Sequence, residues 1–452
     1  MTSAPEAVSA ETRVARELAA ALKRNGVPYL FGIPGGGSSI DLIEACRAED
    51  IPFVLVQHET TAALMAVVCG ELTGSCGACI SIMGTGAINL AGCATYAFLE
   101  RHPLLCITET YGLDGAPLMS IQKIDHGATF APYCKDEITL GSDDPGRQID
   151  DAIRLAMAER PGPIHVDYPQ SMDGGPPART ARNTPPAPSR PEGDLEAIAN
   201  EIDRAEKPII IAGPVVLRQH AESELLRLAE RLHCAVMVTS KARGVISEDH
   251  PLYAGIISGV YGEGTLEGRM VHKSDTVLAI GLDRMELLTP WKHRQPLLTL
   301  DVIPVSADDA VGEPLLTASG PMPMLLDSLT ATVRQRSTWQ TSEIEDFWSQ
   351  AMNELGAEGA DLNAASVPGQ HRHRFRHRPS RAAGHVGGSQ QLVSAQTDDS
   401  PVRDASGVLD GGRGRRPCVG RDADLDGVAC FGSRVWAAYL GRRIPVLDVA
   451  AY

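Results

Sequence analysis

The sequence predicts an α/β protein with two doubly wound parallel-sheet domains, followed by a poorly ordered C-terminal tail. Short, nearly continuous apolar runs alternate with helical patterns through residues 1–173 and again through 195–335, which is typical of strands covered by helices on both faces. A proline-rich linker, residues 174–194, separates the two repeats. In residues 368–452 the periodic apolar pattern stops, and such a stretch cannot bury a large core.

In the first domain, helical and strand patterns follow one another closely. Val14, Leu18 and Leu22 share one helical face, and Asn25-Gly26 ends that helix. Further helices are expected at 40–46, 60–71, 88–100 and from Asp143 to Arg160, and strands at 29–33, 53–57, 78–83, 104–108 and 163–169.

The second domain repeats this alternation. Helices are expected at 195–205 and 221–232, and strands at 208–212, 235–239, 276–281 and 297–302. A further helical segment, 342–362, lies in residues 336–367, which we assign to the start of a third domain.

Composition limits the function classes. The 452 residues, of which 43% are hydrophobic, suffice for two or three domains with their own cores. The formal net charge of −16 argues against nucleic acid or an anionic membrane as the main partner. No apolar run approaches the roughly 20 residues of a membrane span, and the N-terminus lacks the basic flank and apolar core of a signal peptide. We therefore expect a cytoplasmic protein.

The ten cysteines do not form a disulfide framework in a chain of this length. Cys76 and Cys79 are formally a C-x-x-C pair, but Cys79 continues into a strand and no second pair stands at zinc spacing. We interpret them as packing residues and predict no metal ligands.

Three turns that follow predicted strands carry the candidate chemistry. The first is Phe31-Gly32-Ile33-Pro34-Gly35, the second His58-Glu59, and the third Gly84-Thr85-Gly86-Ala87-Ile88-Asn89. Glycine allows close approach of the backbone to a ligand. A carboxylate such as Glu59, placed where a strand gives way to a helix, is costly unless something uses it.

In this order and spacing the three motifs resemble the pyrimidine-binding domain of thiamin-diphosphate enzymes, most closely that of the acetolactate synthase large subunit. Arg160-Pro161-Gly162-Pro163 followed by V-D-x-P is similar to the end of that domain. Residues 195–335 resemble the family's central domain, which binds FAD in acetolactate synthases and nothing in many relatives. Because this region lacks G-x-G-x-x-G, and because Asp301 could either contact a ribose or cap its strand, FAD binding stays open.

The resemblance implies that Glu59 is the catalytic residue. In the family this acid shares a proton with the aminopyrimidine of thiamin diphosphate, which helps to form the carbanion that attacks a 2-oxo acid such as pyruvate. A buried carboxyl is biased toward its neutral form, which suits this role. The other implied cofactor contacts are Pro34, Gly35, Gly84, Thr85, Asn89 and Gln122.

Some of these positions carry an alternative or a departure from the family. Thr85 stands where the family usually has Pro, and Lys123 follows Gln122 where the family has Glu, in a region that faces the substrate. Asn89 could instead be a helix N-cap. We interpret His58 as structural, and His126 either lines the pocket or lies in a solvated loop.

The resemblance also implies a third domain that holds the diphosphate through Mg²⁺. Its G-D-G motif, with an Asn some two dozen residues later, is absent from this sequence. We therefore expect only the pyrimidine half of the cofactor site, without the magnesium site.

Three interpretations compete for the tail. Residues 368–452 contain thirteen Arg, no Lys and no Glu. A basic nucleic-acid arm is one interpretation. A metal site is another, at the His cluster from His371 or at Asp422–Gly427, although Ser433 stands where a calcium loop needs Glu. We favour the third, in which a reading-frame change near Val367 removed the natural third domain.

The predicted function is a thiamin-diphosphate-dependent transferase or lyase that acts on 2-oxo acids, inactive alone because the diphosphate half is missing. The alternatives are a non-catalytic partner that lends its pyrimidine half-site to another chain, and a 2-oxo acid decarboxylase. As in the family, we expect a homodimer or tetramer formed through the first domain.

Overall fold

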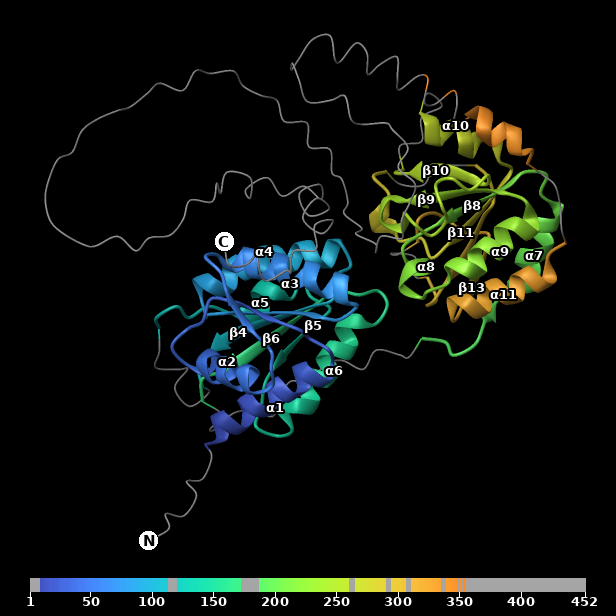
Figure 1. The fold of residues 1–452 in the computed structure, drawn as a ribbon. Coiled ribbons are helices and arrows are strands. Elements are labelled where there is room, and N and C mark those ends of the chain that lie inside the picture. The colour runs from blue at the N-terminus through green and yellow to red at the C-terminus, as the bar shows by residue number, and fades with distance from the viewer. Residues whose placement is uncertain are drawn as a thin grey trace, which may run out of the picture. The chain divides into compact units, whose positions relative to one another are not determined.

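The computed structural model describes residues 9–112, 120–171, 187–259, 265–289, 294–305, 310–334 and 339–347, together with 350 and 353 (Figure 1). The predictions for the tail, including the His371 cluster and Asp422–Gly427, lie outside the described residues, as does most of the proposed linker.

The first domain is built on a six-stranded sheet in which every pairing is parallel, with the order β2-β1-β3-β4-β6-β5. The chain moves from β1 outward to β2 and then returns to the other side of β1 to form β3. The boundary between β1 and β3 is therefore a topological switch point, where open α/β sheets bind ligands beyond the carboxyl ends of their strands. The strands are β1 Leu30–Gly32, β2 Phe53–Leu55, β3 Gly77–Ser81, β4 Leu104–Thr110, β5 Asp136–Thr139 and β6 Pro163–Pro169.

Helices cover both faces of this sheet (Figure 1). Helices α3, α4 and α5 lie on one face, and α1, α2 and α6 on the other. Leu18 and Leu22 of α1 pack into a core with Leu30, Ile80 and Leu105 of the strands, so the predicted apolar face of the first helix is the buried one. The helices are α1 Ala10–Arg24, α2 Ser38–Ala48, α3 Glu59–Thr73, α4 Thr85–Leu99, α5 His126–Phe130 and α6 Pro145–Met157.

The second domain holds a seven-stranded sheet with the order β10-β9-β8-β11-β12-β13-β7. All of its pairings are parallel except that of β7 with β13. The strands are β7 Glu192–Gly193, β8 Pro208–Ala212, β9 Ala235–Thr239, β10 Tyr253–Ile257, β11 Thr276–Ile280, β12 Leu297–Asp301 and β13 Leu316–Ser319. The helices are α7 Leu195–Arg204, α8 Val215–Arg218, α9 Glu222–Leu232, α10 Leu266–Lys273 and α11 Met322–Thr332, with short 3₁₀ turns at Ser240–Ala242 and Arg284–Glu286.

The predicted fold class is confirmed, since both domains are α/β and the pairings in their sheets are all or mostly parallel. The structure adds β5, β10 and β13, for which the sequence carries a weak strand signal. In β5 an Asp-Glu pair occupies half of the strand, and in β10 and β13 the apolar run is interrupted by Gly255 or replaced by small polar residues. β5 and β10 lie at the edges of their sheets, where strands are often short, whereas β13 lies between β12 and β7.

Two segments belong to the second domain although they lie outside its predicted limits. Glu192–Gly193 lies in the stretch assigned to the linker but pairs with β13 as an antiparallel edge strand. Trp339, Ile344 and Phe347 lie in the stretch assigned to a third domain, yet they belong to the core of the second domain. The indole N–H of Trp339 donates a 2.7 Å hydrogen bond to the Pro208 carbonyl at the start of β8, and the ring is fully buried.

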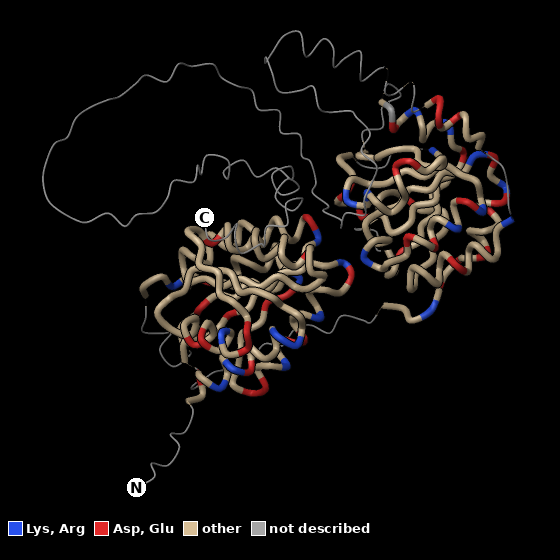
Figure 2. The backbone as a smooth tube through the Cα atoms, in the orientation of Figure 1, with Lys and Arg blue, Asp and Glu red and all other residues tan. Residues whose placement is uncertain are grey.

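Charged residues are interspersed around both sheets (Figure 2). In the part of the chain that the structure describes, none of the helices combines the length and apolar character needed to cross a bilayer.

Candidate functional site

Glu59 is the first residue of α3 and is buried, with 7% of its surface exposed. His58 caps the helix, because its Nδ1 accepts a 3.2 Å hydrogen bond from the Thr60 N–H, so His58 has the structural role that the sequence predicts. The N-terminus of a helix favours negative charge. Glu59 is therefore a buried carboxyl at the edge of the first sheet where the strands have their carboxyl ends.

The N-terminus of α4 meets Glu59. Asn89 Nδ2 donates a 2.9 Å hydrogen bond to Glu59 Oε2. A Cβ on Gly86 would lie 3.0 Å from Glu59 Oε1, tighter than an ordinary contact. Thr60 Oγ1 in turn donates to the Asn89 carbonyl at 3.0 Å, which joins the two helices directly.

The capping alternative for Asn89 is wrong. Gly84 occupies the N-cap of α4, with a φ of 70°, and Asn89 lies one turn inside the helix. Its side chain is therefore used on Glu59 and not on the backbone at the helix end.

The turn after β1 donates hydrogen bonds to a second buried acid, Glu109, which was not among the predicted site residues. Glu109, at the end of β4, is fully buried, and its Oε1 accepts hydrogen bonds from Ser39 N at 2.8 Å and from Gly37 N at 3.3 Å. A Cβ on Gly35 would lie 1.8 Å from Glu109 Oε2, so a side chain there would displace the Glu109 carboxyl from its present position. The same signal that marks Glu59, an acid at the end of an apolar strand, would have found it.

Gln122 is exposed and has a φ of 56°. A Cβ on Gly84 would lie 2.6 Å from Gln122 Cβ, so the loop that carries Gln122 packs directly on the turn between β3 and α4. The structure thus brings together Glu59, Asn89 and the Gly84–Gly86 turn, with Gln122 packed against that turn. Pro34 and Gly35 follow β1, and Gly35 lies against Glu109.

His126 is buried, with 4% exposed, so it is not a solvated loop residue. Its Nε2 accepts a 3.1 Å hydrogen bond from the Gly84 N–H, and its Nδ1 lies 2.8 Å from Asp167 Oδ1. Thr108 Oγ1 donates to the same carboxylate oxygen at 3.0 Å and lies 2.8 Å from His165 Nε2. This cluster joins β4, β6 and α5 to the Gly84 turn.

The histidine ligand atoms and the Asp167 oxygen lie within 4.8 Å of one another. Two imidazoles and a carboxylate form a ligand set that binds transition metals in other proteins. The 2.8 Å separation of His126 Nδ1 and Asp167 Oδ1, however, is that of a hydrogen bond. We therefore describe the group as a hydrogen-bonded cluster.

Burial sets the protonation of this cluster. It lowers the pKa of His165 to about 4, against the opposing charge of Asp167. Burial would raise the pKa of Asp167, but the hydrogen bond from His126 and the nearby imidazoles hold that pKa below its ordinary value. The Asp167 carboxyl is thus held in its ionised form beside a neutral His165.

The cysteines of the C-x-x-C pair are both fully buried. Cys79 Sγ donates to the Leu105 carbonyl at 3.4 Å, and burial raises the pKa of Cys76 well above its ordinary range. A buried thiol of this kind is unreactive. The packing interpretation of both residues agrees with their environment.

In the second domain, Asp301 ends β12 and is 1% exposed. Its Oδ1 accepts from the Val302 N–H at 2.7 Å and its Oδ2 from Arg160 at 3.3 Å, as the strand-capping interpretation expects. Burial raises the pKa of Asp301 to about 6, against the opposing charge of Arg160.

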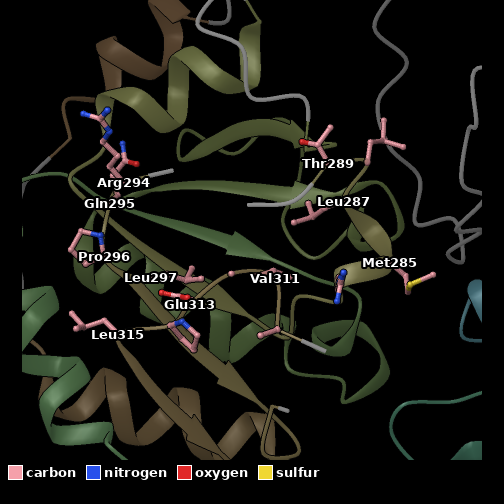
Figure 3. A pocket seen from close by; sticks show the side chains of 15 residues that line it. Met285, Leu287, Thr289, Arg294, Gln295, Pro296, Leu297, Val311, Glu313 and Leu315 are labelled. Carbon is pink, nitrogen blue, oxygen red and sulfur yellow. The ribbon is translucent and has the colours of Figure 1, made fainter. Parts of the chain in front are cut away.

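A cavity of about 1130 Å³ opens beside β12 (Figure 3). Arg294, Glu313 and Thr289 line it with mostly apolar neighbours. Residues 290–293 and 306–309, which adjoin the lining segments, lie outside the described residues, so we assign no ligand to this cavity.

Comparison with known proteins agrees with the two-domain division. Residues 12–129 match the family model of the thiamine pyrophosphate enzyme N-terminal TPP binding domain, and residues 195–318 match that of the central domain. Thiamine pyrophosphate (TPP) is another name for thiamin diphosphate.

Curated proteins similar to this chain include acetolactate synthases. A probable acetolactate synthase large subunit of Methanocaldococcus jannaschii is 27% identical over 337 residues, which cover 71% of this chain and 56% of that protein. The acetolactate synthase large subunit IlvG of Mycobacterium tuberculosis is 32% identical over 245 residues, covering 52% and 44%. The chain thus spans about half the length of the curated relatives it matches.

Among solved structures, benzoylformate decarboxylase from Polynucleobacter necessarius superimposes with a TM-score of 0.60 at 20% identity, covering 73% of this chain and 62% of that one. At this identity the likeness concerns the fold. Together with the two family models and the Glu59 site, it leads to one conclusion: the chain belongs to the thiamine pyrophosphate enzyme family, of which it carries the N-terminal TPP binding domain and the central domain.

Proposed function

We propose that the first domain forms the pyrimidine-binding half of a thiamin-diphosphate site, and that the complete site converts 2-oxo acids such as pyruvate in an acetolactate synthase-like reaction. The observation that carries this proposal is the buried Glu59 carboxyl, held by Asn89 at the switch point of a parallel sheet. The acetolactate synthase relatives support the reaction class.

The residues present fit the pyrimidine ring. Glu59 is buried, and among the described residues its side chain bonds to the neutral Asn89 and to no cation, as a proton-sharing carboxyl requires. At Gly86 the backbone of α4 comes so close to the carboxyl that a Cβ would lie 3.0 Å from Glu59 Oε1, so glycine permits this approach. Pro34, Gly35, Gly84, Thr85 and Gln122 are proposed as further contacts, through the backbone for the glycines.

Each residue has a separable task. Asn89 engages Glu59 Oε2 and so fixes the plane of the carboxyl. Oε1, on the side of Gly86, is then the atom that shares a proton with a ring nitrogen. Bound thiamin diphosphate would supply the carbon nucleophile that adds to the keto group of the substrate.

We infer that a diphosphate domain, with Mg²⁺, completes the site. The two matched regions together correspond to only part of the relatives' length. The absence of a G-D-G motif from the sequence favours a second candidate function, in which this chain is not itself catalytic and lends its pyrimidine half to a full-length partner.

We also infer that copies of the chain associate through α4. Ile88, Tyr96 and Leu99 of this helix expose 49%, 39% and 44% of their surfaces, although its other apolar residues face the sheet. Large apolar side chains that gather on one exposed helix face mark an interaction surface.

The test is ligand binding by the chain itself. We expect NMR shift changes at Gly86 and Asn89 on addition of thiamin diphosphate and Mg²⁺, and weaker changes in Glu59→Gln. Glu44→Gln, an exposed acid of α2, is the matched control and should leave binding unchanged. Shift changes that leave Gly86 and Asn89 untouched would contradict the proposal.

A further inference from the structure

We propose that His126 is a positioning residue, whose Nε2 holds the turn between β3 and α4 in the form that sets Gly86 and Asn89 against Glu59. This inference rests on the proposed function of the Glu59 site. Its structural part, the hold on the turn, can be measured without any ligand.

The hydrogen bonds fix where the protons lie. Gly84 donates its backbone N–H to His126 Nε2, so this nitrogen carries a lone pair and the ring proton is on Nδ1. From Nδ1 the proton points to Asp167 Oδ1 at 2.8 Å. The result is a directed chain in which Asp167 orients His126, and His126 orients Gly84.

Asp167 is itself fixed by a neighbour. Thr108 donates its hydroxyl proton to Asp167 Oδ1, which leaves the threonine oxygen to accept from His165 Nε2 at 2.8 Å. His165 is immobilised by its stack on Phe130, with 4.0 Å between ring centroids. The carboxylate that aims His126 therefore has little freedom to turn.

The Gly84 turn needs an outside acceptor. α4 has no side-chain cap, and Gly84 adopts a φ of 70° that favours glycine. Its N–H is buried, and an unpaired buried N–H is costly. His126 removes that cost only when the turn has its present shape, so it selects this shape.

The two residues of α4 that contact Glu59 lie close to Gly84 in the chain. Gly86 lies two residues after Gly84 and borders Glu59 Oε1, and Asn89 lies three residues further and binds Oε2. A displaced turn would move both contacts on the carboxyl together. Within the described residues, His126 bonds to Gly84 and not to Glu59, so its effect on the site passes through Gly84.

Two amide substitutions at His126 distinguish the role of Nε2 from that of Nδ1. Gln can place an oxygen near the position of Nε2 and accept from Gly84, whereas Asn is shorter and reaches only the position of Nδ1. His126→Gln should therefore keep the turn and His126→Asn should lose it, although both variants put an amide of similar polarity in the same pocket.

The experiment measures amide hydrogen exchange of Gly84 in the unliganded chain, and thiamin diphosphate binding with Mg²⁺ by NMR titration. In His126→Asn we expect Gly84 to exchange about 10- to 100-fold faster, which corresponds to the loss of one acceptor by a buried N–H. We expect binding to weaken by a similar factor. His126→Gln should stay within about threefold of the parent chain in both measurements, with unfolding midpoints recorded for all variants.

Unchanged exchange at Gly84 in His126→Asn would overturn the inference. So would equal losses in both variants, because the position of the acceptor would then be irrelevant. A stoichiometric metal ion that leaves the chain in His126→Asn would overturn it as well, since the cluster would then be a metal site. If the parent chain shows the exchange pattern but binds no thiamin diphosphate, the proposed function fails while the hold of His126 on the turn stands.

Discussion

Asn89 donates a 2.9 Å hydrogen bond to Glu59, and through it the first turns of α3 and α4 are joined side chain to side chain. The carboxyl is buried on one side by the helix that it begins and held on the other by a residue 30 positions later. A double-mutant cycle should detect this bond. Asn89→Leu alone should destabilise the chain by about 1–3 kcal/mol, since Glu59 Oε2 loses its donor.

The coupling energy between Asn89→Leu and Glu59→Leu, from urea unfolding of the two single variants and the double variant, should be at least about 0.5 kcal/mol. Additive effects would show that the hydrogen bond contributes nothing to folding. Thr95→Val, elsewhere on α4, combined with Glu59→Leu serves as the pair that should be additive.

Acid should destabilise the first domain through His165. Its ordinary pKa is 6.5, and burial lowers the pKa to about 4 in the folded chain. Above pH 6.5 the ring is neutral in both states, so its full contribution to stability is present. As the pH falls from 6.5 to about 4 the unfolded chain binds a proton that the folded chain does not, and stability is lost, by about 3 kcal/mol in total.

His165→Leu should therefore make the unfolding free energy less dependent on pH between 6.5 and 4. Some dependence should remain, because burial also lowers the pKa of His102 to about 4. His58→Asn, which replaces an exposed histidine by another good N-cap, should leave the slope as it is. An identical slope in His165→Leu and the parent chain would contradict the assignment.

The sequence predicted Glu59 because an isolated acid between a strand and a helix is visible in the order of residues alone. It could not predict the His126 cluster. Thr108, His126 and Asp167 meet because β4 pairs with β6, although β5 comes between them in the chain. Whether His126 lies in a pocket or in solvent depends on that pairing, which residue order does not reveal.

The limits of the second domain were missed for a related reason. Trp339 lies four residues beyond the predicted end of the second domain, residues 195–335, and only its contact with Pro208 shows where it belongs. In the same way, Glu192–Gly193 carries no strand signal and is a strand only because β13 offers an open edge.

Truncation should separate these segments. A chain that ends at Val367 should keep its unfolding midpoint, because residues 368–452 lack the apolar periodicity of a packed segment. A chain that ends at Arg334 loses Trp339 and should be less stable by about 3–5 kcal/mol. A large loss from the first truncation would show that the tail packs on the rest of the chain.

Association through α4 should depend on its exposed apolar residues. We expect sedimentation at micromolar concentration to show a dimer or a larger species, and Ile88→Lys with Leu99→Lys to shift it to monomer, since lysine opposes burial of that face. Met324→Lys on α11, where 46% of the side chain surface is exposed, should have no effect. A monomeric parent chain would contradict the proposed association.

The last prediction concerns turnover. Glu59 can share a proton with the pyrimidine, but the sequence contains no G-D-G motif for a magnesium-bound diphosphate, and unpaired phosphate charges oppose binding. We therefore expect the chain alone to show no consumption of pyruvate with thiamin diphosphate and Mg²⁺. Fused in frame to the diphosphate domain of an acetolactate synthase relative, it should turn over pyruvate. Glu59→Gln in that fusion should then reduce kcat by about a hundredfold or more, because the proton-sharing carboxyl is lost. Glu44→Gln should leave kcat unchanged. Turnover by the chain alone would show that it holds a complete site, and full activity of the Glu59→Gln fusion would show that another group carries the proton.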